Sequence, residues 1–197
     1  IGRLLAREEG KPLSNGIAET MRAAQIFKFF AQETLRIEGT QVASVRPNVD
    51  VTITREPVGV VGLICPWNFT IAIPAWKIAP ALAFGNTVVF KPADLVPGSA
   101  WALVEIASRA GLPKGVLNLV MGRGSVVGQV FLAHKDVNAI SFTGSVDTGS
   151  KVAMACAARG AKFQLEMGGK NPLVVMADAN LDAAVAGAVD GAFFQTG

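Results

Sequence analysis

Residues 58–91, VGVVGLICPWNFTIAIPAWKIAPALAFGNTVVFK, decide the fold. They begin with a short apolar run over 58–64, which is rich in Val and therefore predicts a buried strand. A helical pattern over 73–83 follows, interrupted by Pro80, and a second apolar run over 86–90 predicts another strand. A strand, a helix and a strand in this order indicate a crossover unit, in which the two strands are parallel.

The same alternation continues along the chain. Further helices are predicted over 98–110, 125–133, 145–158 and 181–194, and further strands over 116–120, 139–142, 162–166 and 172–176. Upstream, residues 3–36 have helical spacing, whereas 41–56 have the polar and β-branched pattern of strands at an edge or a subunit contact. The alternation therefore predicts an α/β fold with a parallel sheet, accompanied by an additional strand pair.

Composition excludes several classes of protein. The chain has 197 residues, of which 51% are hydrophobic and 17% charged, so it is not disordered. Charged residues and prolines interrupt the long apolar stretches, so no membrane span is expected. The net charge is +3 and the basic residues are scattered, so no nucleic-acid partner is expected. Two cysteines and one histidine exclude a Cys/His metal site and a disulfide framework, and they favour a reducing, cytoplasmic compartment.

Ligands of doubly wound sheets bind beyond the carboxyl ends of the strands, and several of these ends carry polar residues. Asn68 follows the strand over 58–64, and its amide could donate to an oxyanion or could bond its own turn. Lys91 follows the next strand and could bind a phosphate or a ribose hydroxyl. Asp94 could accept from a ribose diol, or the two residues could be a solvated loop pair.

Two glycine-rich turns, 122–128 and 142–149, each lead into a predicted helix N-terminus, where free N–H groups favour a phosphate. Neither turn is G-x-G-x-x-G, but two such turns on neighbouring strands indicate a nucleotide. Glu166 precedes two glycines, an arrangement that suits a general base acting on water. The alternative is an exposed turn.

Three single residues are interpreted as structural. His134 ends a predicted helix and is expected to be a surface cap. Cys156 lies in an Ala-rich helix and is expected in the core. Cys65 ends a buried strand, which favours packing over a nucleophilic role.

Taken together, these stretches resemble the aldehyde dehydrogenase superfamily over essentially the whole chain. The most specific motifs are PWNF at 66–69, WKIAPALA at 76–83, GNTVV at 85–89, FKP at 90–92, FTGS at 142–145 and EMGGK at 166–170. They occur in the order and spacing of the family. The sequence around 54–80 is most similar to dehydrogenases of small semialdehydes.

The resemblance implies oxidation of an aldehyde to the carboxylic acid, with NAD or NADP, through a cysteine thioester. It assigns Asn68 to the oxyanion and Glu166 to the water that hydrolyses the thioester. Lys77 either supports this site or forms a structural pair. The cofactor-binding residues that the resemblance implies are Trp67, Lys91, Asp94, Gly124, Gly144, Ser145 and Met167.

The resemblance also implies the fold class and the domain organisation. The fold is α/β, a Rossmann-like doubly wound parallel sheet with an oligomerisation strand pair, and it is an incomplete version of the family's fold. The resemblance makes 1–41 the helical part of the cofactor domain, 42–56 the oligomerisation strands of a dimer or tetramer, 57–168 the NAD(P)-binding domain and 169–197 the start of the catalytic domain. Family spacing puts the nucleophilic cysteine about three residues beyond Gly197, so the chain is expected to be an inner, inactive piece. The alternative is a non-catalytic dinucleotide-binding or oligomerising module.

Three positions depart from the family pattern. Thr70 stands where proline is frequent, which is expected to alter only the turn, and Met167 stands where leucine is usual. Asp94 stands where glutamate marks many NAD-preferring members. Because Asp is shorter, repulsion of a 2′-phosphate is weaker, and the choice between NAD and NADP stays open.

Overall fold

The computed structural model describes residues 1–193 of the chain. Its centre is a parallel sheet of five strands in the order β5-β4-β3-β6-β7. The strands are β3 (Val60–Ile64), β4 (Thr87–Lys91), β5 (Leu117–Leu119), β6 (Ala139–Gly144) and β7 (Lys162–Met167). Strand order reverses at β3, because β4 and β5 extend the sheet on one side of it and β6 and β7 on the other. The switch point, where such sheets bind ligands, lies between β3 and β6.

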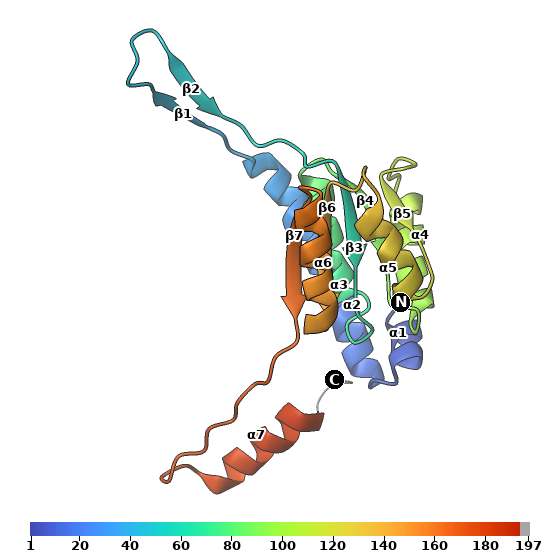
Figure 1. Cartoon of the computed structure of the whole chain (residues 1–197). Helices are drawn as coiled ribbons and strands as arrows, with labels where there is room; N and C mark the ends of the chain where they lie inside the picture. Colours follow the sequence, from blue (N-terminus) through green and yellow to red (C-terminus); the bar gives the residue numbers. More distant parts are fainter. Residues whose placement is uncertain (194–197) are drawn as a thin grey trace.

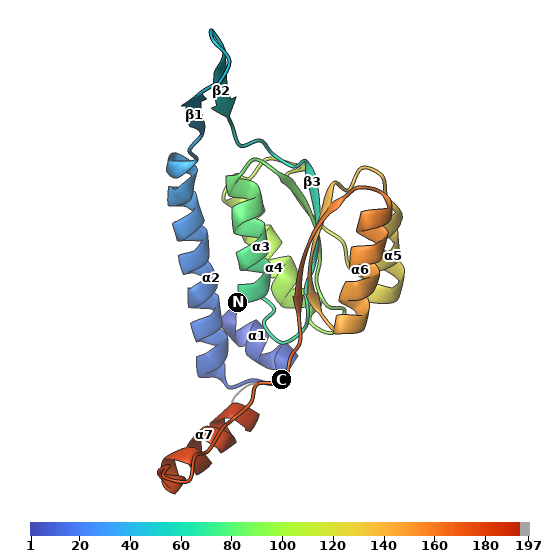
Figure 2. The same ribbon diagram turned by 60° about the vertical axis from the view of Figure 1, so that its left-hand side comes forward.

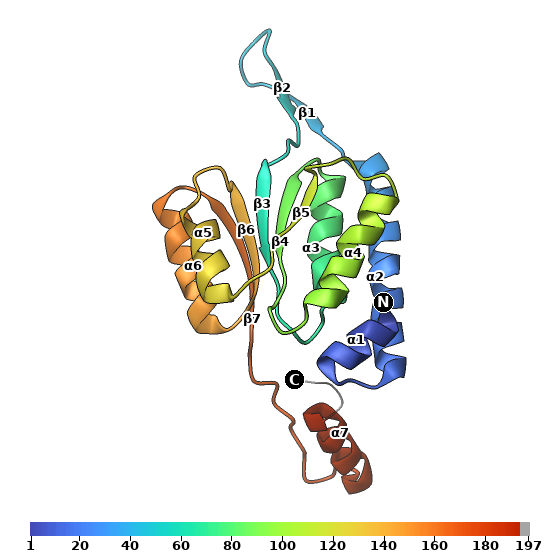
Figure 3. The same cartoon turned by 90° about the vertical axis from the view of Figure 1, so that its right-hand side faces the viewer.

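Helices cover both faces of this sheet (Figure 3). On one face lie α3 (Ala72–Ala83) and α4 (Pro97–Arg109), and on the other lie α5 (Gly124–Ala133) and α6 (Val146–Ala158). The long helix α2 (Leu13–Glu33) packs along α3, and α1 (Gly2–Glu9) lies near the foot of both (Figure 2). A short 3-10 turn, η1 (Thr34–Arg36), ends α2. The predicted doubly wound α/β fold is confirmed.

Two apolar cores, one on each face, fix the strands. Leu63, Val88 and Phe90 are buried between the sheet and the helices α3 and α4. Ile140 and Val152 lie in the second core, beneath α5 and α6. Because the central strands β3 and β4 are largely buried, the loops at their carboxyl ends start from rigid positions.

The strand pair β1 (Thr40–Ala43) and β2 (Asp50–Ile53) forms an antiparallel sheet of its own. Every residue of both strands is exposed. Figure 1 shows the hairpin projecting away from the main sheet, at the end opposite to the carboxyl ends of the strands. The predicted strands are confirmed, whereas their role in oligomerisation and the domain boundaries stay predictions.

The strand predicted over 172–176 is wrong. This segment is exposed and pairs with no strand within residues 1–193. Its apolar run has the composition of a buried strand, but a strand requires a neighbouring strand to hydrogen-bond its backbone N–H and C=O groups. The helix predicted after it is confirmed as α7 (Leu181–Phe193), which has no buried residue, and Phe194 lies outside the described residues.

Among residues 1–193, no helix is long and apolar enough to cross a membrane. The same residues contain no group of three or more His, Cys, Asp or Glu side chains that could hold a metal ion.

Candidate active site

A cleft of about 950 Å³ lies at the carboxyl ends of β3, β6 and β7. Its position is the one expected for the ligand site of a doubly wound sheet. Of the predicted site residues, those that line it are Trp67, Asn68, Gly144, Ser145, Glu166 and Met167. The structure therefore brings both predicted catalytic side chains to one cavity.

Asn68 lies in the loop between β3 and α3. At the start of this loop, Cys65 N donates to Lys91 O at 3.2 Å, which extends the ladder between β3 and β4. At its end, Ile73 N donates to Phe69 O at 3.2 Å, a bond that leads into α3. The loop is short and tied at both ends, so the cores hold Asn68 at the rim of the cleft.

Glu166 lies on β7, where Gln164 shares its face because side chains alternate along a strand. Gln164 Nε2 donates to Glu166 Oε1 at 2.9 Å. From α3, Lys77 Nζ donates to Gln164 Oε1 at 3.1 Å and to Ser141 Oγ at 2.6 Å. A single amide, that of Gln164, therefore connects the buried ammonium group of Lys77 to the carboxylate of Glu166.

Burial shifts the pKa values of both Lys77 and Cys65, and nearby charges oppose each shift. Burial lowers the pKa of Lys77, while the charges of Cys65 and Glu166 act in the opposite direction. Burial raises the pKa of Cys65 to about 12, against the attraction of Lys77 and Lys91. Cys65 is only 4% exposed, so it packs, as predicted, and is poorly suited to act as a nucleophile.

The other two lone residues also have structural roles. Cys156 is fully buried in the core beneath α6, as expected. His134 is exposed at the end of α5, where its backbone N–H donates to Val130 O at 2.9 Å. This is the predicted helix cap.

Close packing explains Gly144 of the cleft and also Gly149, which packs against the cleft residue Met167. A Cβ on Gly144 would come within 2.6 Å of Phe142, and one on Gly149 within 2.4 Å of Met167 Sδ. Ser145 caps α6, since its Oγ accepts from Thr148 N at 3.4 Å. The backbone therefore lies close to the cleft at a helix N-terminus, a geometry that suits a phosphate.

Of the three remaining predicted residues, Asp94 lines a second, smaller depression of about 250 Å³ together with Gly122, whereas Lys91 and Gly124 do not line it. Lys91 is buried and its Nζ donates to Pro92 O at 2.6 Å. Burial lowers the pKa of Lys91, and the charge of Asp94 opposes this shift. A Cβ on Gly124 would lie 3.9 Å from Lys91 Nζ, so these groups are close together. A cation, an acid and open backbone side by side fit the sugar and phosphates of a dinucleotide.

Sequence reasoning missed several polar residues that support the cleft. Gln164 and Ser141 face each other across β6 and β7, where the register pairs them directly. The period of two along β7 would have placed Gln164 beside Glu166. A second group, Glu9, Lys11 and Glu19, lies behind the Asn68 loop, and its residues are far from Asn68 in sequence. No local pattern indicates that contact.

Comparisons with known proteins give one consistent family. The sequence model described as the aldehyde dehydrogenase family matches residues 1–197. The chain is 48% identical to the alpha-ketoglutaric semialdehyde dehydrogenase of Bacillus subtilis, an alignment that covers 100% of this chain and 40% of that protein. It is 44% identical to the 2,5-dioxopentanoate dehydrogenase of Saccharolobus solfataricus, over 98% of this chain and 41% of that protein.

Solved structures agree with these relatives. Betaine aldehyde dehydrogenase of Staphylococcus aureus in complex with NAD+ has a TM-score of 0.94 and 38% identity, over 98% of this chain and 38% of that one. An NADP-dependent enzyme of E. coli has a TM-score of 0.92 and 41% identity, over 98% of this chain and 40% of that one. The chain spans about two fifths of the length of the relatives that it matches.

Proposed function

Because the chain belongs to the aldehyde dehydrogenase family, we propose that the protein oxidises an aldehyde to the carboxylic acid with NAD or NADP, through a cysteine thioester. The observation that carries this proposal is the common cleft of Asn68 and Glu166. One side chain offers an N–H donor and the other a proton acceptor, the two groups that acyl transfer to water requires.

Asn68 acts on the first half of the reaction. When a thiolate attacks the aldehyde carbon, the carbonyl oxygen gains negative charge, and the Asn68 amide donates to it. The short loop that carries Asn68 is tied to β4 and to α3, so the donor is in place before charge develops. Such preorganisation is what makes an oxyanion donor effective.

Glu166 acts on the second half. Once the hydride has left, to a nicotinamide that the cleft would hold, water would hydrolyse the remaining thioester. Glu166 takes a proton from that water, and the thiol leaves as the acid forms. The bond from Gln164 orients the carboxylate on the strand, and the glycines that follow, Gly168 and Gly169, have open space around them.

The nucleophile is proposed to lie outside the 197 residues. Cys65 and Cys156 are both buried, and burial raises the pKa of each thiol. Neither lines the cleft. Family spacing puts the reactive cysteine about three residues beyond Gly197, in a stretch that follows residues outside the described range.

The cofactor is proposed to lie across both cavities. Lys91 and Asp94 would hold the adenosine ribose, and Gly124 would lie under the adenine. The start of α6 at Gly144 and Ser145 would receive the pyrophosphate. In the larger cleft, the cofactor-facing positions would be Trp67 and Met167. Asp94 is exposed at the rim of the smaller depression, so its carboxylate is available to a ribose.

The substrate is proposed to be a small semialdehyde. Two of the most similar relatives are named for semialdehydes or a dioxoacid, and their identity to this chain is 44% or more. A homo-oligomer is proposed to form through β1 and β2, because every side chain of this hairpin is exposed and its strands have free edges. The proposed compartment is the cytoplasm, since both cysteines are free.

The test uses the complete gene product, a panel of aldehydes with and without a distal carboxylate, and both cofactors. Production of reduced nicotinamide with a carboxylated aldehyde is the expected result. Cofactor binding without turnover of any aldehyde would instead support a non-catalytic dinucleotide-binding module. Light scattering of the same sample at micromolar concentration tests the oligomer, and a monomer would contradict it.

A further inference from the structure

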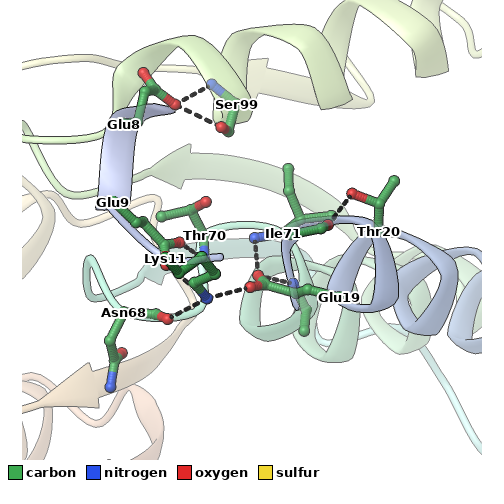
Figure 4. A network of polar contacts seen from close by, with 11 residues as sticks. Glu8, Glu9, Lys11, Glu19, Thr20, Asn68, Thr70, Ile71 and Ser99 are labelled. Carbon is green, nitrogen blue, oxygen red and sulfur yellow. Dashed lines mark hydrogen bonds and ion pairs between the residues drawn. The ribbon is translucent and has the colours of Figure 1, made fainter. Parts of the chain in front are cut away.

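A cluster of three charged side chains lies behind the Asn68 loop (Figure 4). Lys11 Nζ is 2.6 Å from Glu9 Oε2 and 2.7 Å from Glu19 Oε2. All three side chains are at most 3% exposed. The ammonium also lies 4.6 Å from the centre of the Phe69 ring, which adds a cation–π contact.

Glu19 connects this cluster to the start of α3. Its Oε1 accepts from Ile71 N at 2.9 Å and from Ala72 N at 3.1 Å. These are two of the backbone N–H groups that a helix N-terminus leaves unsatisfied, and the helix dipole favours a carboxylate there. Glu19 therefore fixes the point at which the loop enters the helix.

The other two members hold the loop itself. Glu9 Oε1 accepts from Thr70 N at 3.2 Å, and Lys11 Nζ donates to the backbone oxygen of Asn68 at 3.0 Å. A proline in place of Thr70, as is frequent in the family, would have no N–H for this bond. The expectation that Thr70 alters only the turn is therefore wrong, because Thr70 gains a contact with a buried acid.

The charges of this cluster make its geometry specific. Burying a charge is unfavourable unless it is paired and hydrogen-bonded, and here the ammonium lies between two carboxylates. Burial raises the pKa of Glu9, and Lys11 opposes that shift. Removing one member leaves a buried charge without its partner, so the three side chains and the loop stay together only in one arrangement.

Glu8, which precedes Glu9 on α1, holds the start of α4 in the same way. Glu8 accepts from Gly98 N at 2.6 Å and from Ser99 N at 2.8 Å, at the start of α4. This helix follows the loop that contains Asp94. Glu8 of α1 therefore caps α4 and Glu19 of α2 caps α3, and each of the two capped helices follows a loop that lines one of the two cavities.

We propose that Glu9, Lys11 and Glu19 are positioning residues that hold the backbone of Asn68 for the acylation step. The inference rests on the proposed function of Asn68, and it assigns to α1 and α2 a role in catalysis that involves no contact with substrate. None of the three residues lines the cleft.

The experiment combines two measurements on the complete gene product. Amide hydrogen exchange reports opening of residues 70–72 and needs no activity. Stopped-flow absorbance reports the burst of reduced nicotinamide. In Lys11→Met and Glu19→Gln, we expect exchange at 70–72 to rise about tenfold or more. We expect the burst to slow by about tenfold, which is less than the 10²–10³ typical of losing the donor itself.

Two further variants distinguish a specific effect on the loop from simple unfolding. Lys11→Arg keeps the charge but presents a planar group that cannot bridge both acids and Asn68 O in the same way, so a smaller effect of the same kind is expected. Glu8→Gln is the matched control, because it loses the same type of helix cap. Its exchange should rise at Gly98 and Ser99 and stay unchanged at 70–72. Unchanged exchange in β4 shows that each variant is folded.

The outcomes separate the two proposals. Faster exchange at 70–72 with an unchanged burst rate in folded Lys11→Arg or Glu19→Gln would overturn the positioning role and leave the proposed function intact. Unchanged exchange would overturn it as well. A gene product that oxidises no aldehyde would overturn the proposed function, and exchange at 70–72 alone would then decide whether the cluster holds the loop.

Discussion

The two proposed catalytic side chains are supported in very different ways. Asn68 lies on a loop held by the ladder to β4, by α3 and by three buried charges. Glu166 lies near the exposed end of β7, where a hydrogen bond from Gln164 holds its carboxylate and two unobstructed glycines follow. The difference indicates that Asn68 is a fixed group, which suits a developing oxyanion. It indicates that Glu166 is a movable group, which suits a water molecule that attacks only after hydride has left.

The largest effect is expected for Glu166→Gln. Loss of the base should reduce the steady-state rate by about 10²–10⁴, the usual contribution of general base catalysis. Acylation and hydride transfer should proceed, so the first turnover should still release a burst of reduced nicotinamide. Stopped-flow absorbance on the complete gene product measures both phases. A burst slowed as much as the steady state would mean that Glu166 activates the thiol instead of water.

Asn68→Ala is expected to affect the other phase. The amide acts on the tetrahedral species of acylation, so the burst itself should slow by about 10²–10³. The same stopped-flow trace measures the burst rate. Asn138→Ala is not a suitable control, because the Asn138 side chain holds β3. Asn15→Ala, on the partly exposed start of α2, is suitable. An unchanged burst would contradict the oxyanion role.

A smaller effect is expected for Gln164→Leu. A hydrogen bond to a charged group contributes about 1.5–3 kcal/mol, and exposure at β7 reduces this, so the steady-state rate should fall by about tenfold. The burst rate should not change, because Asn68 is supported from elsewhere. Gln129→Leu on the exposed face of α5 is the matched control, since it makes the same chemical change outside the cleft. Loss of the burst would show that Gln164 serves acylation.

Whether the sequence predicts a residue of this site depends on how far apart in the sequence the contacting residues lie. Asn68 lies in the loop after β3 and Glu166 lies near the carboxyl end of β7, so the position of the strands in a doubly wound sheet is enough to identify them. Gln164 requires the register of β6 against β7, which pairs it with Ser141. Lys11 meets Asn68 across 57 positions of sequence, and a polar residue near a helix start usually faces solvent. Tertiary packing alone decides that contact.

The error over 172–176 has the same cause. Leu173, Val174 and Val175 have strand propensity, but propensity does not say whether a neighbouring strand is present. In contrast, the strand over 58–64 was predicted correctly because the crossover pattern around it specifies its neighbours. Local composition identifies an apolar run, and the surrounding order of elements identifies its partner.

The smallest effect on catalysis is expected for Cys65, at the start of the Asn68 loop. Its pKa of about 12 leaves a thiolate fraction of about 10⁻⁴ at pH 8, so iodoacetamide should not modify it in the folded protein. Peptide mapping after native and denatured alkylation checks this, and modification of native Cys65 would contradict the burial. Cys65→Ala should change the burst rate by less than about twofold, because the thiol makes no bond to substrate.

The pH dependence of folding stability should change in Cys65→Ala, unlike the burst rate. The unfolded thiol ionises near its ordinary pKa of 9.0, whereas the folded thiol does not ionise until about 12. The folded state therefore binds more protons over this interval, and Cys65 makes unfolding more favourable as the pH rises above 9. Urea titrations at pH 8 and pH 10 should show a smaller loss of stability in Cys65→Ala than in the unchanged protein, and an equal loss would mean that Cys65 is accessible to water.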